Sequence, residues 1–197
     1  MKKSNEKNQS VLIVYSSSGG STEGIARSLG ESLAREADVA VVELGRDRSR
    51  WPNPDDYGAV IAGSPIRYDH WMPEMRSFVE LHRISLAKKP TAFFFSCLSL
   101  ATPDRGGKEQ AAIYASKIRN IAPELRLLDV RGFAGTLRYS AVPFLLRIPF
   151  RAFMKSKGIS EGDYRDWSGI QGWARGTLAP AFALRAHRGA PGVLTSI

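Results

Sequence analysis

VLIVYSSSGGSTEGIARSLGESL, residues Val11–Leu33, is the stretch that decides how the rest of the chain can fold. It opens with a short apolar run from Val11 to Tyr15, rich in β-branched residues, which is typical of a buried strand. Apolar residues then recur at Ile25, Leu29 and Leu33 with the spacing of a helix face. We therefore predict a strand, a loop of serines and glycines, and a helix, in that order.

The loop between this strand and this helix is suited to hold a phosphate group. Gly19 and Gly20 let the backbone approach a ligand closely, and the following helix directs its unpaired N–H groups and positive dipole end at the same point. Hydroxyl donors surround the two glycines, at Ser16, Ser17, Ser18, Ser21 and Thr22. The loop has no Lys or Arg and matches neither the Walker loop nor GxGxxG, which favours a monophosphate, with flavin mononucleotide (FMN) as the leading candidate. The alternative is a serine-rich turn that only caps the helix.

Length and composition place the chain among ordinary globular proteins. Its 197 residues fit a single domain, and 43% hydrophobic with 24% charged residues argue against disorder or a fibre. The single cysteine, Cys97, excludes an internal disulfide and a thiolate metal cluster, and we interpret it as core packing. The histidines at 70, 82 and 187 have no metal-ligand spacing, so we expect no metal site.

The net charge of +9 favours an anionic partner, which is nucleic acid, an anionic membrane surface or an acidic substrate. Solvated surface charge is the alternative. The polar start of the chain contains no signal-peptide pattern, and no uncharged apolar run approaches the roughly 20 residues that span a bilayer. We therefore expect a cytoplasmic protein.

Apolar runs of strand length recur along the chain and alternate with helical segments. They lie at Asp38–Leu44, Gly58–Gly63, Pro90–Leu100 and Leu125–Gly135. Short continuous apolar strands separated by helices indicate a parallel sheet covered on both faces. With the first strand they make five, and a phosphate loop after the first of five predicts the doubly wound α/β order 2-1-3-4-5.

The loops after the third and fourth strands are placed to enclose a flavin ring, because ligands of such sheets bind beyond the carboxyl ends of the strands. The first loop, Ser64–Trp71, offers Tyr68 or Trp71 to stack on the ring and Arg67 to face an anion. The second is Ser99–Gly107. The alternative for the first loop is that Trp71 packs at the start of the next helix and Arg67 faces solvent.

A basic and apolar segment, Thr136–Ser160, precedes the last helical segment at about Asp166–Ala179. Between residues 130 and 160 there are six Lys or Arg and no acid, with aromatic side chains interleaved and prolines at 143 and 149 that break any single long helix. This composition is typical of an element on an anionic membrane surface. A cover for an acidic, amphipathic substrate and simple packing on the domain are the alternatives. Nucleic acid is disfavoured, because the apolar content is too high for a surface that follows a phosphate backbone.

Five stretches together resemble one known family. They are YSSSGGST at 15–22, IRYDH at 66–70, GTLRY at 135–139, the basic insert at 140–160 and DYRDW at 163–167. From about Val11 to Ala179 the chain resembles the flavodoxin-type, menaquinone-dependent protoporphyrinogen dehydrogenases. Asp69 departs from the small residue that we expect at its position.

The resemblance implies a flavodoxin-like fold with FMN as cofactor. The expected cofactor contacts are Ser16, Ser17, Ser18, Gly20, Ser21 and Thr22 in the phosphate loop, and Ile66, Arg67, Tyr68, Ser99, Leu100 and Ala101 in the two ring loops. The resemblance also implies oxidation of protoporphyrinogen IX to protoporphyrin IX in haem biosynthesis, with menaquinone in the membrane as electron acceptor. Arg138 and Tyr139 are expected on the substrate side. Since a flavin carries the redox chemistry itself, no catalytic acid or base is identified.

Other functions stay open from the sequence alone. An electron-transfer flavoprotein, an NAD(P)H-dependent quinone reductase and an adaptor without flavin all fit the same fold. We expect a polar extension at 1–10, one FMN-binding domain at 11–179 with the insert at 140–160, and a flexible tail at 180–197. The expected location is peripheral, on the cytoplasmic face of the inner membrane, and a homo-oligomer stays open.

Overall fold

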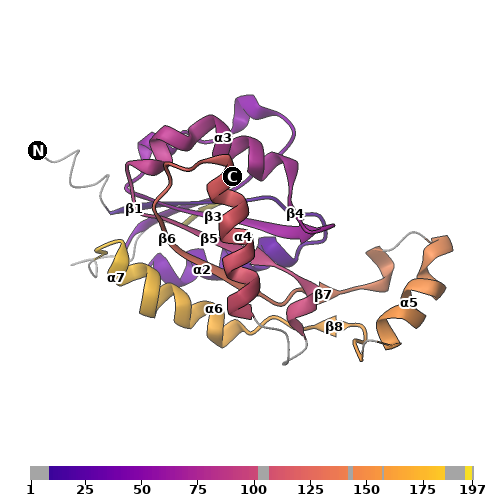
Figure 1. The fold of residues 1–197 in the computed structure, drawn as a ribbon. Coiled ribbons are helices and arrows are strands. Elements are labelled where there is room, and N and C mark those ends of the chain that lie inside the picture. The colour runs from indigo at the N-terminus through magenta and orange to yellow at the C-terminus, as the bar shows by residue number, and fades with distance from the viewer. Residues whose placement is uncertain (1–8, 102–106, 142–143, 157, 185–193, 197) are drawn as a thin grey trace, which may run out of the picture.

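The fold is taken from a computed structural model, which describes residues 9–101, 107–141, 144–156, 158–184 and 194–196. Its centre is a twisted sheet whose five main strands are parallel, in the order β6-β5-β3-β1-β2 (Figure 1). These strands are β1 (Ser10–Tyr15), β2 (Asp38–Glu43), β3 (Ala59–Arg67), β5 (Thr91–Ser96) and β6 (Leu127–Phe133). Counted along the chain, the order is the predicted 2-1-3-4-5, which confirms the doubly wound fold.

Two short strands of the main sheet were not predicted from the sequence. β4 (His70–Trp71) folds back antiparallel on the end of β3, and β9 (Leu194–Ser196) adds a parallel strand beside β2. β9 lies in the segment that we expected to be a flexible tail, so part of that segment extends the sheet. A strand of three residues is too short to show an apolar period in the sequence. It is recognised only by its pairing with the edge of β2.

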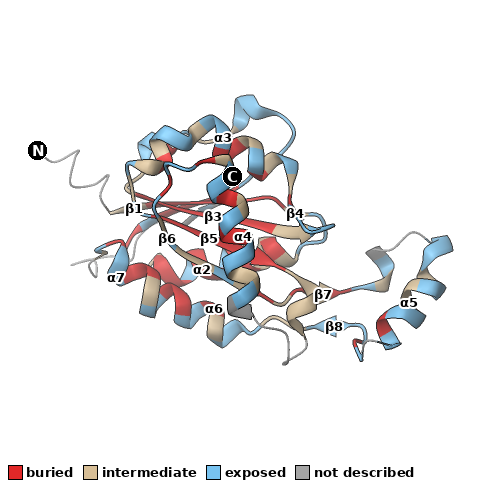
Figure 2. Ribbon diagram, in the orientation of Figure 1, coloured by how far each residue is buried: buried red, intermediate tan, exposed pale blue. Residues whose placement is uncertain are grey.

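Helices cover both faces of the sheet, because β1 is apolar on both sides. Its residues from Val11 to Tyr15 are at most 4% exposed, and they alternate between two core clusters. Burying each aliphatic side chain of this kind contributes about 1.5–3 kcal/mol. One face is covered by α2 (Ser21–Leu33), α6 (Trp167–Trp173), the π-helical turn η6 (Ala174–Leu178) and α7 (Ala179–Ala181), and the other by α3 (Pro73–Ala87) and α4 (Gly107–Ile121). Figure 2 shows the buried strands between these layers.

The basic insert forms a separate projection. It leaves the sheet through β7 (Thr136–Leu137), which pairs antiparallel with β8 (Gly162–Asp163), and between them lie η4 (Tyr139–Ala141), η5 (Phe144–Leu146) and α5 (Arg147–Ser156). Figure 1 shows α5 standing away from the sheet, and Figure 2 shows it largely exposed. Pro149 does not break α5, because it lies in the first turn, where a proline is tolerated. Pro143 lies outside the described residues.

The remaining described elements are short 3₁₀ turns. They are η1 (Arg48–Arg50), η2 (Pro54–Asp56) and η3 (Leu98–Ala101). Within the described parts of the chain, no helix has both the length and the apolar character that a membrane crossing requires.

Candidate functional site

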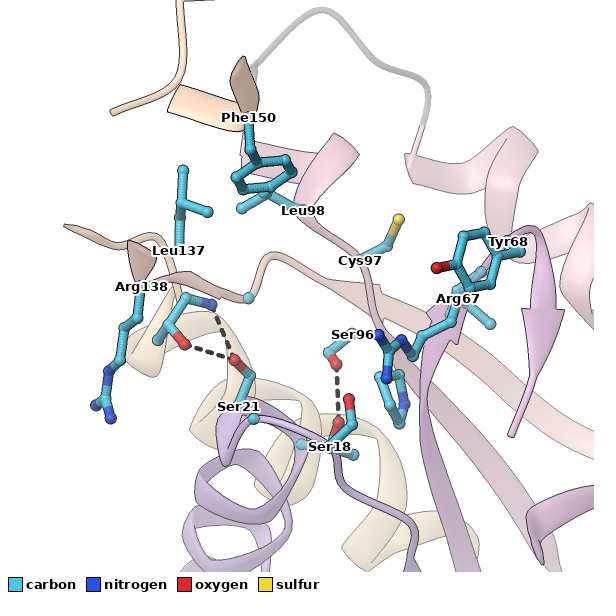
Figure 3. A pocket seen from close by; sticks show the side chains of 16 residues that line it. Ser18, Ser21, Arg67, Tyr68, Ser96, Cys97, Leu98, Leu137, Arg138 and Phe150 are labelled. Carbon is cyan, nitrogen blue, oxygen red and sulfur yellow. Dashed lines mark hydrogen bonds between the residues drawn. The ribbon is translucent and has the colours of Figure 1, made fainter. Parts of the chain in front are cut away.

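A cavity of about 440 Å³ opens where β1, β3 and β5 end, at the edge of the sheet where ligands of doubly wound folds bind. Figure 3 shows its polar floor, with Ser18 and Ser21, and its apolar side, with Leu98, Leu137 and Phe150. The residues that line it are Ser18, Gly19, Ser21, Thr22, Pro65, Ile66, Arg67, Tyr68, Ser96, Cys97, Leu98, Gly135, Thr136, Leu137, Arg138 and Phe150.

The loop after β1 is built to receive an anion. Gly20 has a φ of +80°, a conformation that favours glycine, and no side chain caps the N-terminus of α2 behind it. The first N–H groups of a helix have no partner inside it, so those of α2 are left for a ligand or water. Ser16 Oγ is buried and has no hydrogen-bond partner, while Ser17 Oγ accepts the N–H of Gly20 at 3.1 Å. An unsatisfied buried hydroxyl costs about 1–3 kcal/mol, which a phosphate oxygen would remove.

Two hydroxyls of the loop tie it to other walls of the cavity. Thr22 Oγ1 and Ser96 Oγ are hydrogen-bonded at 2.8 Å in a buried position at the end of β5. Ser21 Oγ accepts the Thr136 N–H at 3.0 Å and lies 2.6 Å from Thr136 Oγ1 (Figure 3). Ser21 and Thr22 therefore hold three segments of the chain together at the cavity.

The opposite wall is formed by the turn that joins β3 and β4. Tyr68 is 91% exposed and stands at the edge of the cavity. In Figure 3 Arg67 points from β3 toward the serine–glycine loop, and Arg138 extends on the other side of the cavity. The site thus combines an anion-receiving floor, an aromatic side wall and two cations at separate places.

The cavity contains some of the residues that the sequence predicted, namely Ser18, Ser21, Thr22, Ile66, Arg67, Tyr68 and Arg138. Ser16, Ser17 and Gly20 belong to the same loop but do not line the cavity. Tyr139 lines a different cavity of about 560 Å³, with Arg151 and Lys155 of α5.

The structure does not bring Ser99, Leu100 and Ala101 to the cavity wall. β5 ends at Ser96, four residues before the predicted end at Leu100, so Ser96 to Leu98 occupy the place expected for residues 99–101. Ser99 Oγ instead donates to Gln110 Oε1 at 3.2 Å, and Leu100 packs against the core. Residues 102–106 of this predicted ring loop lie outside the described residues.

Several wall residues were missed from the sequence. Cys97 packs against the core, as the sequence analysis predicts, but it is only half-buried and also lines the cavity, with Sγ 3.0 Å from Ser99 Oγ. Gly135 to Leu137 lie in the GTLRY stretch and were available from that motif. Phe150 has no local signal, since only the path of the insert brings α5 to the cavity.

The DYRDW stretch lies against α2 and pairs, through β8, with β7 at the cavity wall. Arg165 donates from Nε and Nη2 to the two carboxylate oxygens of Asp163 at 2.8 and 2.7 Å, and its guanidinium lies 4.2 Å from the ring centroid of Trp167. These hydrogen bonds from Arg165 lower the pKa of Asp163. A Cβ on Gly24 of α2 would lie 2.2 Å from Arg165 Nη1, so the glycine leaves room for this group. Asp166 Oδ1 accepts the Gly169 N–H at 2.9 Å and caps α6.

A doubly wound sheet with an anion-receiving loop after its first strand and an aromatic residue beside the cavity defines a flavodoxin-like flavoprotein. The flavodoxin domain family matches residues 12–162, and the chain belongs to this family. It is accordingly an FMN-binding oxidoreductase, and the orphaned Ser16 hydroxyl and uncapped α2 fit the phosphate of that cofactor.

The relatives of the chain agree with the resemblance found in its motifs. It is 31% identical over 173 residues to protoporphyrinogen IX dehydrogenase (quinone) of Escherichia coli (strain K12), with 83% of this chain and 92% of that protein covered. The protein of the same name from Leishmania major is 30% identical, with 83% and 72% covered. Rubredoxin oxygen:oxidoreductase of Desulfovibrio gigas shares the fold, with a TM-score of 0.54 and 18% identity over 92% of this chain and 38% of that chain.

Proposed function

We propose that this protein oxidises protoporphyrinogen IX to protoporphyrin IX in haem biosynthesis and passes the electrons to menaquinone in the membrane. The observation that carries the proposal is that one cavity joins the anion-receiving loop to an apolar wall to which the insert contributes Phe150. A chain 31% identical to an Escherichia coli protoporphyrinogen IX dehydrogenase (quinone) supports the choice of substrate. FMN supplies the redox chemistry when bound, and the residues of the chain bind and orient.

The proposal gives each part of the cavity a role. The serine–glycine loop holds the FMN phosphate through backbone N–H groups and hydroxyls. Tyr68 flanks the flavin ring, and Leu98, Leu137 and Phe150 form the apolar surface against which a tetrapyrrole or a quinone packs. Arg67 and Arg138, on separate sides of the cavity, are the cations available to the acidic side chains of the substrate.

The insert tip, residues 144–156, is proposed to dock on an anionic membrane at the cytoplasmic face of the inner membrane. Its large apolar side chains are exposed to a degree unusual for a packed helix, at 78% for Phe144, 86% for Leu145, 82% for Ile148 and 57% for Phe153. The cations Arg147, Arg151 and Lys155 stand among them, and no acidic residue lies between 144 and 156. Apolar side chains interleaved with cations are what an interfacial helix on anionic lipid needs.

Figure 1 adds a reason to connect the membrane with the chemistry, since α5 projects from the body while Phe150 on α5 reaches back to the cavity. Met154 and Phe150 pack in the small cluster at the base of the insert, and Phe153 faces outward. One helix therefore has a face for the cavity and a face for lipid. This arrangement supports electron transfer to a quinone that stays in the bilayer.

The test is the appearance of porphyrin fluorescence from protoporphyrinogen under anaerobic conditions, with a menaquinone analogue as acceptor. We expect fluorescence that grows only when both FMN and the quinone are present. A protein that binds FMN but produces no porphyrin would contradict the substrate. Rapid bleaching of its flavin by NAD(P)H would then favour an NAD(P)H-dependent quinone reductase, and fast reduction of a redox protein would favour an electron carrier.

A further inference from the structure

The turn between β3 and β4 has an unfavourable backbone. Because Arg67 pairs with His70, only Tyr68 and Asp69 form the turn, and their φ angles are +48° and +65°. Two positive φ values are the geometry of a tight hairpin turn, where glycine, asparagine and aspartate are favoured. Tyrosine is rarely found in this conformation, so something outside the turn has to hold it.

Three hydrogen bonds from α4 hold Asp69. The hydroxyl of Tyr114 donates to Asp69 Oδ1 at 2.9 Å, and Lys117 Nζ donates to both Oδ2 and the backbone oxygen of Asp69. Residues 114 and 117 are neighbours on one face of a helix, so both groups approach from the same side. We refer to Asp69, Tyr114 and Lys117 as the Asp69 latch.

The anchor on α4 is itself rigid. Tyr114 is 7% exposed, and its ring packs against Phe95 of β5 with centroids 4.7 Å apart and against Trp71 at 6.4 Å. The Trp71 indole N–H donates to the backbone oxygen of Tyr114 at 3.2 Å. The latch therefore fixes the turn to the packed core and not to another loop. The lowered pKa of Asp69, caused first by the Lys117 hydrogen bond and then by that of Tyr114, keeps the carboxylate charged.

Tyr68 depends on the turn for its position. At 91% exposure its ring gains almost no packing of its own, yet it stands at the edge of the cavity beside Arg67 (Figure 3). Neither Tyr114 nor Lys117 lines this cavity, and Lys117 instead borders a separate one of about 350 Å³ with His70 and Arg76. The latch thus acts from behind the turn, without access to a ligand in front of it.

We propose that Asp69 is a positioning residue, which together with Tyr114 and Lys117 holds the Tyr68 ring where it stacks on the flavin ring. The inference rests on the proposed placement of the flavin ring beside Tyr68. It also explains the carboxylate at a position where a small residue was expected, since a small residue could not reach α4. The latch contributes to flavin affinity through Tyr68 and has no part in holding the phosphate.

The test measures dissociation constants of FMN and of riboflavin, which lacks the phosphate, by quenching of flavin fluorescence with the full chain. Lys117→Met should weaken both ligands by the same factor, about fivefold, as expected when a partly exposed charged hydrogen bond is lost. Ser18→Ala, in the phosphate loop, should weaken FMN and spare riboflavin. The ratio of the two constants therefore separates loss of the ring contact from loss of the phosphate contact.

A double-mutant cycle shows whether the latch acts through Tyr68. In a Tyr68→Ala background, Lys117→Met should change riboflavin affinity by less than about 1.5-fold, because the ring that the latch positions is absent. Arg119→Met removes an exposed cation from the same helix and should leave both constants unchanged. Tyr114→Phe, which keeps the packed ring and removes only the hydroxyl, repeats the test if Lys117→Met does not fold.

Equal weakening by Lys117→Met in the wild-type and Tyr68→Ala backgrounds would overturn the proposal, as would weakening of FMN alone. A wild-type protein that binds FMN but not riboflavin would also overturn it, because the ring contact would then contribute nothing measurable. If flavin affinity follows the latch while no protoporphyrinogen is oxidised, the latch stands and the proposed substrate fails. The two hypotheses are thus tested independently.

Discussion

Two regions meet at the cavity, and they are made in opposite ways. The serine–glycine loop at 16–22 is held by hydrogen bonds to β5 and β7, and Ser16 and Thr22 are at most 2% exposed. The insert tip at 144–156 leaves five large apolar side chains more than half exposed beside three cations. The loop is held in place by hydrogen bonds within the chain, whereas the tip leaves large apolar side chains exposed. A fixed cofactor loop on one side and an exposed apolar surface on the other would suit the proposed enzyme, whose cofactor stays bound while its electron acceptor lies in a membrane.

The largest effect is expected when the insert tip is made polar and the serine–glycine loop is left unchanged. Replacing Phe144, Leu145 and Ile148 together by serine removes most of the exposed apolar area, and each buried side chain contributes about 1.5–3 kcal/mol to lipid binding. We expect binding to anionic liposomes, measured by sedimentation, to fall by about 100-fold or more, with FMN affinity unchanged. Retained liposome binding would sink the membrane assignment of the insert.

A second substitution removes a hydrogen bond that holds the serine–glycine loop and leaves the insert tip unchanged. Thr22→Val removes the hydroxyl that pairs with Ser96 Oγ in a buried place, which leaves Ser96 unsatisfied at a cost of about 1–3 kcal/mol. We expect a lower melting temperature and FMN binding weakened by about tenfold, with liposome binding as in the wild type. The matched variant Ser96→Ala removes the other partner of the same hydrogen bond and should lower stability similarly. If both variants bind FMN as tightly as the wild type, the loop is not held by this bond.

The cations of the insert tip are expected to contribute separately to binding of anionic membranes. Arg151→Gln and Lys155→Gln should each weaken binding to anionic liposomes by about fivefold at low salt, since each basic residue near such a surface contributes about 1 kcal/mol. Binding to neutral liposomes should not change, and the difference should shrink as salt is raised. Arg175→Gln, which removes an exposed cation of η6 outside the insert, serves as the control for net charge.

The smallest expected change in stability concerns Asp163 of β8, the strand that pairs with β7 at the cavity wall. Arg165 lowers the pKa of Asp163 from its ordinary value of 3.8, so this carboxylate stabilises the fold above that value and the contribution is lost as the pH falls through the lowered pKa. Asp163→Asn should therefore lower the melting temperature slightly at about pH 6, and the difference from the wild type should shrink as the pH falls through the lowered pKa. A constant difference at every pH would show that the ionised form of Asp163 does not stabilise the fold.

The sequence was sufficient for the parts of the molecule that local pattern determines. The apolar run of β1 and the helix period after Gly20 predicted the strand, loop and helix correctly, and four further apolar runs gave the sheet order. These elements are long enough to show their period, and β1 is buried on both faces. The phosphate loop followed from them, because its place at the end of β1 is fixed by the topology.

The rest of the site depends on contacts that sequence spacing does not contain. Residues 99–101 do not line the cavity because β5 ends at Ser96, although the apolar run in the sequence continues to Leu100. Phe150 reaches the cavity only through the path of the insert. In the Asp69 latch, Tyr114 and Lys117 lie 45 and 48 positions after Asp69 in the sequence. No local pattern around Asp69 predicts these two partners.

One measurement tests the central claim most directly, namely porphyrin formation on anionic vesicles that contain menaquinone. The wild-type protein loaded with FMN should convert protoporphyrinogen on these vesicles, and the triple serine variant of the tip should fail there yet keep its activity with a soluble quinone analogue. That pair of results would tie the preformed flavin site to a membrane acceptor. Absence of porphyrin from the FMN-loaded wild type in both assays would contradict the account.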